Sequence, residues 1–332
     1  DRYFGTADVS GFYALTDLRW ADLLRLTLGV RREEANYEVT TPTSITDNVG
    51  TVSGFDRTDT LPSLGLTWFA SENTQVRFTT GKSVSYPLLV EISDTLFLDP
   101  DTGEQFAGNP DLEATEIESY DLRWEWYPSA KEAVTAGIFL KDLKSPIERQ
   151  FLPVAGGGQR IQFTNGETGE VYGFEIDGRA GLDWFSDIGL LPESDLLKKS
   201  YVQANFTITE SEVEIGPGGI ATNRQRRLQG QADTVFNFQL GYDGAMHDWT
   251  LALNRVGERL DAAGANGRPD VFQQPSTFVD LTYSLGFFNR GKLKLKAENL
   301  LNEEIDFMQG PLLQQRFILG RSFGASLSWE VF

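Results

Sequence analysis

Residues 322–332 read SFGASLSWEVF, and their alternation decides which folds the chain can adopt. Every second residue from Phe323 to Val331 is Phe, Ala, Leu, Trp or Val, and every residue between them is Gly, Ser or Glu. Side chains of a β-strand point alternately to its two sides, so this strand has one apolar and one polar face. The apolar face would line the core of a soluble sandwich, or would face lipid in a transmembrane barrel whose interior is polar.

The same period of two recurs along the chain and predicts about thirteen antiparallel strands. Clear examples are residues 24–31, 120–126 and 292–297, in which apolar residues alternate with polar, charged or small ones. Many of the predicted strands are roughly ten residues long, the length that crosses a bilayer at a tilt. The chain lacks a run of about 18 apolar residues, so no transmembrane helix is expected.

The connections between these strands are short at one end and long at the other. The short ones fall near residues 18–22, 70–73, 127–132, 243–247 and 288–291. The long ones span residues 40–56, 86–114, 148–160, 215–226, 260–276 and 302–320. One connection on the short side, about 183–198, is longer than the rest and is expected to contain a helical turn. This asymmetry is typical of outer-membrane barrels, which have short periplasmic turns and longer extracellular loops.

Tryptophan is confined to the end with the short connections. All seven Trp residues lie within a few residues of a short-side turn: Trp20, Trp68, Trp124, Trp126, Trp184, Trp249 and Trp329. An indole ring has an apolar body and an N–H group that needs a partner, so Trp favours the boundary between membrane and water. The set predicts a membrane-interface girdle; the alternative is that these side chains fill the core of a large soluble β protein.

Charge and composition exclude several classes of function. The net charge of -19 argues against nucleic-acid binding, which requires a basic surface. There is no cysteine, so neither disulfides nor thiolate metal sites can form. The only histidine, His247, falls in a predicted short turn, and no pair of carboxylates stands out by its spacing. The sequence therefore does not predict an enzyme.

Several short motifs stand out along the second part of the chain. They are LPSLGLTW at 61–68, TTGKSVSYP at 79–87, GNPDLEATE at 108–116, YDL at 120–122 and WYPS at 126–129. They continue through KDLKSPI at 141–147, YGFEID at 172–177, AENLLNEE at 297–304 and GRSF at 320–323. Together these segments resemble the barrel of TonB-dependent outer-membrane receptors. Because these motifs occur in the order that the family has, residues 1–332 are identified as the C-terminal portion of such a barrel.

This resemblance implies an all-β, antiparallel transmembrane β-barrel of about 22 strands, of which this chain would supply about thirteen. The plug domain, its TonB-box segment and the early strands are then expected outside this chain, and residue 1 is expected near an extracellular loop. The implied location is the bacterial outer membrane. The implied function is energised import of a scarce nutrient, with a siderophore-type ligand slightly favoured. A structural barrel that anchors a surface partner without transport remains the alternative.

The expected partners follow from the same resemblance. They are outer-membrane lipid and lipopolysaccharide, the TonB system acting through a plug, the barrel-assembly machinery and a candidate surface lipoprotein. The terminal Phe332 resembles the aromatic residue that the assembly machinery recognises, although it lies one position out of phase with the apolar row from Phe323 to Val331.

Candidate ligand contacts lie in the long loops, because substrate choice in such receptors is made by loops. They are Asp94, Phe97, Asp99, Asp101, Arg224 and Arg226. The two arginines could bind an anionic ligand or a lipopolysaccharide phosphate. The alternative is that they are solvated charges at the rim of the barrel. Asp99, Asp101 and Glu104 resemble the start of a calcium loop, and an ordinary Asp/Pro/Gly turn is the alternative. Apart from such a loop-bound calcium, no cofactor is expected.

Overall fold

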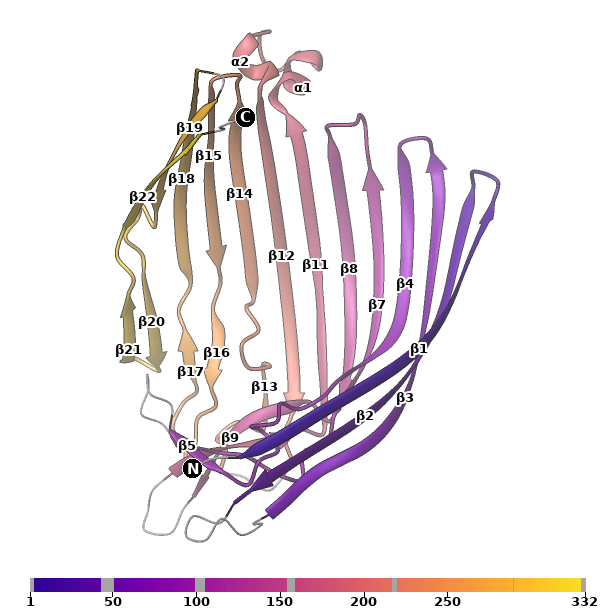
Figure 1. Ribbon diagram of the computed structural model, residues 1–332, viewed down its shortest axis with the longest axis vertical. Coiled ribbons are helices and arrows are strands. Elements are labelled where there is room, and N and C mark those ends of the chain that lie inside the picture. Colours follow the sequence, from indigo (N-terminus) through magenta and orange to yellow (C-terminus); the bar gives the residue numbers. More distant parts are fainter. Residues whose placement is uncertain are drawn as a thin grey trace.

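The computed structural model describes residues 3–42, 51–98, 105–153, 159–216, 220–288 and 290–329. Its main body is a wall of thirteen antiparallel strands that follow one another in chain order (Figure 1). The predicted fold class and strand number are therefore confirmed. The strands of the wall are β1 (Phe4–Trp20), β2 (Leu24–Thr41), β3 (Thr51–Ser71), β4 (Thr74–Ser85), β7 (Thr115–Trp126), β8 (Ala133–Lys144), β11 (Thr168–Gly181), β12 (Ser200–Glu214), β14 (Thr234–Asp243), β15 (His247–Val256), β18 (Ser276–Phe287), β19 (Gly291–Glu298) and β22 (Ser322–Trp329).

Tight turns close one end of the wall, at the top of Figure 1. The longer connection at this end contains α1 (Leu182–Asp187) and α2 (Asp195–Lys198), so the helical turn expected there is confirmed. Ser194 caps α2, because its side chain accepts a hydrogen bond from the backbone N–H of Leu196. No helix within the described ranges has the length and apolar character needed to cross a membrane.

The long connections gather at the opposite end and form small sheets of their own. One sheet has the order β5-β6-β10-β9 and draws its strands from two of these connections, and a second has the order β16-β17-β20-β21. A short strand, β13 (Gln225–Arg226), pairs with β12. The strands of the two sheets are β5 (Leu96–Leu98), β6 (Gln105–Ala107), β9 (Ile147–Pro153), β10 (Gln159–Asn165), β16 (Arg259–Ala262), β17 (Val271–Gln273), β20 (Glu304–Gln309) and β21 (Leu312–Ile318).

Cross-strand register divides the wall into an apolar and a polar face, since residues directly opposite each other in neighbouring strands point to the same side. One row connected by this pairing is entirely apolar: Leu18, Leu26, Leu66, Phe78, Leu122, Ile138, Phe174 and Ile208. The adjacent row points to the other side and is mostly polar: Arg19, Arg25, Thr67, Arg77, Arg123, Gly137, Glu175 and Thr207.

Charged and amide side chains on the polar face pair with one another. Asn237 donates to Asn205 over 2.9 Å, and Asn254 in turn donates to Asn237 over 2.5 Å, so one amide ladder crosses β12, β14 and β15. Ion pairs join Arg25 with Asp17, Arg77 with Glu125, Arg123 with Glu175, and Lys292 with Asp248. This face therefore suits a water-containing interior rather than lipid.

Both lateral edges of the wall are open among the described residues. β1 pairs only with β2, and β22 pairs only with β19. Every residue of both edge strands is exposed. An open edge strand exposes backbone N–H and C=O groups that hydrocarbon cannot satisfy.

Candidate functional site

The long connections pack together into a layer, and two of them share a small apolar core. β6 pairs in parallel with β10, with Phe106 opposite Ile161, although these residues come from different connections. Phe97 of β5 stacks on Phe106 with 5.4 Å between ring centroids, and Phe106 lies 6.3 Å from the ring of Phe163. Offset stacking of this kind adds to the stabilisation that burial provides. Phe97, a predicted ligand contact, is thus the outer member of an aromatic stack.

A buried apolar cluster fastens this layer to the wall. Val39 of β2, Ile92 and Leu112 are each 5% exposed or less. The Ser53 hydroxyl donates a 2.7 Å hydrogen bond to the Ile92 carbonyl, which ties the connection 86–114 to β3 as well. The connection is therefore packed on the wall rather than extended away from it.

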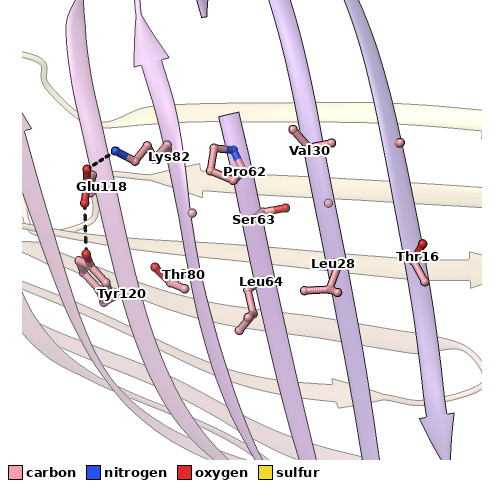
Figure 2. Close-up of a pocket in the computed structure, with 13 residues that line it drawn as sticks. Thr16, Leu28, Val30, Pro62, Ser63, Leu64, Thr80, Lys82, Glu118 and Tyr120 are labelled. Atoms are coloured by element: carbon pink, nitrogen blue, oxygen red, sulfur yellow. Dashed lines mark hydrogen bonds and ion pairs between the residues drawn. The ribbon is translucent and has the colours of Figure 1, made fainter. Parts of the chain in front are cut away.

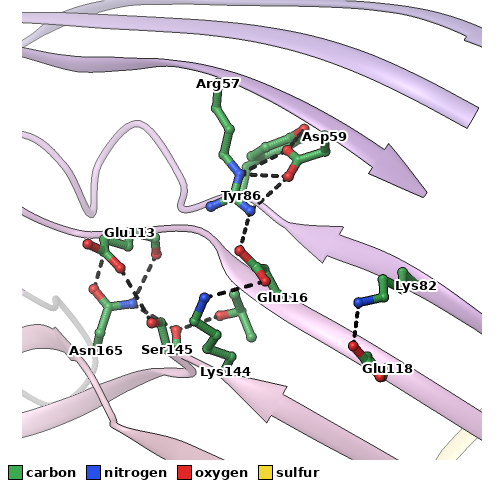
Figure 3. Close-up of polar contacts among 11 residues, drawn as sticks. Arg57, Asp59, Lys82, Tyr86, Glu113, Glu116, Glu118, Lys144, Ser145 and Asn165 are labelled. Atoms are coloured by element: carbon green, nitrogen blue, oxygen red, sulfur yellow. Dashed lines mark hydrogen bonds and ion pairs between the residues drawn. The ribbon is translucent and has the colours of Figure 1, made fainter. Parts of the chain in front are cut away.

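A group of ion pairs and hydrogen bonds centred on Arg57, here called the clamp, also holds the 86–114 connection (Figure 3). The Arg57 guanidinium donates to both carboxylate oxygens of Asp59, over 2.8 and 2.9 Å, and to Glu116 over 2.8 Å. Tyr86 donates its hydroxyl proton to Asp59 over 3.0 Å, and Lys144 lies 3.7 Å from Glu116. Burial, together with the hydrogen bond to Asp59, raises the pKa of Tyr86, so its hydroxyl stays protonated as a donor. The clamp joins β3, β7 and the start of the 86–114 connection.

Asn165 forms a second link beside the clamp, also visible in Figure 3. Its side-chain amide donates to the backbone carbonyls of Glu113 and Ser145, over 2.9 and 2.8 Å. Its side-chain oxygen accepts from the Glu113 N–H over 2.8 Å. One asparagine thereby satisfies backbone groups of two different connections, which fixes their relative position.

A buried ion pair links a third connection, residues 215–233, to this layer. Arg226 of β13 lies 2.6 Å from Glu148 of β9, and the two side chains are only 3% and 4% exposed. Burial raises the pKa of the Glu148 carboxyl, while the neighbouring Arg226 charge acts in the opposite direction. Gln229 adds two hydrogen bonds to the backbone of Arg149, of 2.9 and 3.2 Å. The connections 145–167 and 215–233 are therefore interlocked.

The candidate ligand residues take different positions in this layer. Asp94 is exposed and accepts a 2.7 Å hydrogen bond from Thr51, and Phe97 is half-buried in the aromatic stack. Arg224 is exposed, whereas Arg226 is held in its buried pair with Glu148. Their contact with a ligand stays a prediction.

Asp99, Asp101 and Glu104, the candidate calcium residues, lie outside the described residues, as does Phe332. Within the described ranges, no three His, Asp or Glu side chains converge as they would around a metal ion.

The clamp and the buried ion pair were not predicted from the sequence. Arg57 and Asp59 are two apart and so share a face of a strand, which is a weak signal for an ion pair. Nothing in the sequence connects Arg226 with Glu148, because their contact depends on how two long loops pack.

The Trp residues lie where the wall ends at its short turns. Trp20, Trp68 and Trp124 belong to one cross-strand row, in which Leu24 and Val76 separate them. Trp126 lies 6.5 Å from Trp184 of α1, and Trp329 packs on the rings of Phe287 and Phe288. Trp249 lies opposite Tyr283. The interfacial role of this set stays a prediction.

Comparison with known protein families identifies the family to which this wall of strands belongs. Residues 1–300 match the family described as TonB dependent receptor-like, beta-barrel. The chain belongs to this family. A comparison with curated proteins gives no match.

Solved structures of receptors share the fold at low identity. The ferric-catecholate import receptor Fiu from K12 E. coli is 14% identical with a TM-score of 0.69, over 98% of this chain and 45% of that one. The siderophore receptor PiuA from Acinetobacter baumannii is 14% identical with a TM-score of 0.70, over 98% and 44%. The copper transporter OprC is 13% identical with a TM-score of 0.69, over 98% and 48%. This receptor chain thus spans less than half the length of the structures it matches.

Family membership assigns the two faces and the two ends of the wall. The protein is an outer-membrane receptor barrel, so the apolar rows face lipid and the polar rows face the lumen. The short turns are periplasmic and the layer of long connections is extracellular. The family is one of transporters and not of enzymes, which confirms the expectations for location and for the absence of catalysis.

The buried Arg226–Glu148 pair predicts that removal of Arg226 destabilises the extracellular layer strongly, whereas removal of its neighbour Arg227 does so only weakly. Arg226→Ala should destabilise the extracellular layer by about 3–5 kcal/mol, because it leaves Glu148 buried without a counter-charge. Arg227→Ala is the matched control, since Arg227 forms an exposed pair with Glu258 at 3.6 Å that is worth less than about 1 kcal/mol. Hydrogen exchange of residues 147–151 and 225–229 measures both. Equal protection in the two variants would show that the buried pair does not hold the layer.

Proposed function

We propose that this chain forms the C-terminal wall and part of the extracellular ligand vestibule of a TonB-dependent importer. The observation that carries the proposal is the interlocked layer of long connections at the extracellular end of the wall, which exposes Asp94 and Arg224 and presents Phe97 at the edge of an aromatic stack. A rigid wall with a shaped loop layer at its mouth suits capture of a solute before its passage through the lumen.

The open edges support the view that this wall is one part of a larger barrel. The matching receptor structures are about twice as long as the chain, so their remaining length is enough for further strands and a plug. In the proposed mechanism the loops bind the solute, the plug blocks the lumen, and the TonB system pulls on the plug to open a path. The polar face with its paired charges would line that path.

A metal-chelate complex of the siderophore type is the proposed substrate class. The similar structures include a ferric-catecholate import receptor and a siderophore receptor. Phe97 offers a flat apolar contact for an aromatic chelator, and Arg224 offers a cation for an anionic complex. A copper transporter shares the same fold, so metal ions carried in other forms belong among the solutes to be tested.

Uptake in whole cells tests the proposed function. Cells with and without the receptor are supplied with a panel of radiolabelled ferric siderophores and copper, in backgrounds with and without functional TonB. At least one solute should enter only when both are present. Unchanged uptake of every solute after loss of the receptor, in a correctly assembled outer membrane, would contradict transport and would favour the scaffold barrel.

The aromatic stack predicts how substitution of Phe97 changes the affinity for the solute that the uptake experiment identifies. Phe97→Ala should raise the Kd by about tenfold, since an aromatic contact contributes up to about 1.5 kcal/mol beyond its burial and about 1.4 kcal/mol corresponds to a tenfold change in Kd. Leu98→Ala is the matched control, because Leu98 is the next residue of β5 and points to its other side. Isothermal titration gives the Kd, and limited proteolysis confirms that the loop layer remains intact. An unchanged Kd with an intact layer would remove Phe97 from the binding site.

A further inference from the structure

β3 has an open edge although both of its neighbours in the wall are present. It pairs with β2 from Thr51 to Trp68, but with β4 only from Ser63 to Ser71. Beyond the pair Ser63–Gly81, β1, β2 and β3 continue together while β4 turns away, as Figure 1 shows. Residues 51–62 are therefore unpaired on one side because two adjacent strands of the wall separate.

Pro62 marks the point at which the strands separate, and Figure 2 shows it beside Ser63 on β3, with Thr80 and Lys82 on β4. Proline has no N–H to donate, so in a sheet its nitrogen faces an edge without a partner. The Pro62 carbonyl oxygen also lies toward β4, 3.3 Å from the position that a Cβ on Gly81 would occupy. Successive residues of a strand direct their backbone groups to opposite edges. The N–H and C=O groups that face the open edge are therefore those of residues 52, 54, 56, 58 and 60.

The 86–114 connection covers the inner side of this stretch without closing the edge. The Ser53 side chain binds the Ile92 carbonyl, and the Asp59 side chain accepts from Tyr86. Within the part of the chain that the structure describes, the backbone of residues 51–62 forms hydrogen bonds only in its ladder with β2. An unpaired edge of this length is a template for a further strand.

The outer side of the same stretch is acidic. Two cross-strand rows line a groove of about 540 Å³ across β1, β2 and β3: Asp8–Asn36–Asp56 and Ser10–Glu34–Thr58. The adjoining rows add Glu38 and Arg32, and Arg32 lies 3.7 Å from Glu34 with both side chains more than half exposed. Arg57 points to the inner side, where Asp59 and Glu116 hold its guanidinium. Carboxylates therefore dominate the outer surface beside the open edge.

This surface lies beyond the apolar band of the wall. On β3 the apolar outer row runs from Trp68 through Leu66 and Leu64 to Pro62, and Asp56 lies six positions further along the strand. Six residues of strand span about 20 Å. The open edge and the acidic groove are therefore extracellular and in water, where backbone groups can exchange solvent for a protein strand.

We propose that the open edge of β3 binds an extended, basic segment of another protein at the cell surface, which adds a strand to the wall. The backbone of this segment pairs with residues 52–60. Lysine or arginine at every second position lies beside Asp56 and extends over the groove toward Glu34. Apolar residues at the positions between them lie on the inner side, next to Phe55 and Leu61. A second copy of this chain does not fit, because pairing two β3 edges would bring their acidic rows together.

A synthetic peptide tests the backbone pairing. The probe is a fluorescent peptide of about ten residues in which lysine and valine alternate, and fluorescence anisotropy gives its Kd for the full receptor. In an antiparallel pair, the peptide residue opposite Thr58 points its side chain outward and its N–H toward the receptor. Methylation of the backbone nitrogens of the lysines should therefore abolish binding, whereas methylation of those of the valines should not. Equal affinities of the two methylated peptides, or no binding of the unmodified peptide, would overturn the proposal.

A proline in the receptor blocks the same edge. Thr58→Pro removes an N–H that faces the open edge and leaves the ladder with β2 intact, so the barrel should still fold. The Kd of the lysine–valine peptide should rise about tenfold, because one hydrogen bond is lost and a peptide carbonyl is left without a partner. Thr58→Ala is the matched control, since it keeps the N–H. Both variants must show the heat-dependent electrophoretic shift of a folded barrel, and equal Kd values in the two would contradict strand addition at β3.

Neutralising the groove tests the role of charge. The double variant Glu34→Gln, Asp56→Asn should raise the Kd of the peptide about tenfold, as expected for the loss of two exposed ion pairs. The control is Glu170→Gln, Glu212→Gln, because these two carboxylates lie opposite each other on β11 and β12 and remove the same charge at a distance from β3. Equal effects of the two double variants would show that the peptide responds only to the net charge of the receptor, and the assignment of the groove would be wrong.

Discussion

The continuous antiparallel hydrogen-bond ladder from β1 to β22 is the interaction on which the rest of the structure depends. It pairs the backbone groups that hydrocarbon would otherwise leave unsatisfied, and it keeps neighbouring strands in a fixed register. Because the register is fixed, apolar residues of neighbouring strands line up on one side of the ladder, as in the row that runs from Leu18 to Ile208. A slip by one residue in any strand would turn its charged side chains toward lipid.

The extracellular layer follows a different principle. Its strands are short, and what holds the connections together is a set of polar contacts: the partly exposed Arg57 clamp and Asn165 link, and the buried Arg226–Glu148 pair. Such contacts are directional, so they fix the geometry of loops that have little apolar area to bury. This gives the proposed vestibule a defined shape. It also means that loss of Arg226 leaves the Glu148 charge buried without a partner, which makes the layer sensitive to that substitution.

The wall was predictable from the sequence because its signal is local. A period of two over roughly ten residues identifies each strand, and turn lengths identify the two ends, including the helical segment between β11 and β12. The loop layer was not predictable, since β5 and β6 are only three residues each and show no period. The pairing of Phe106 with Ile161 and the burial of Arg226 arise from packing between distant segments. Arg226 and Arg224 are close in sequence, yet one is buried and the other exposed.

The central claim is that one face of this wall contacts lipid and the other faces a lumen, and site-directed spin labelling tests it most directly. The chain contains no cysteine, so single cysteines can be placed and labelled at each residue of β8 from Val134 to Leu140 in the receptor in bilayers. Collision with oxygen, which concentrates in lipid, should peak at residues 134, 136, 138 and 140 and fall at 135, 137 and 139. A profile without this period of two, or one with its maxima at the odd positions, would contradict the account.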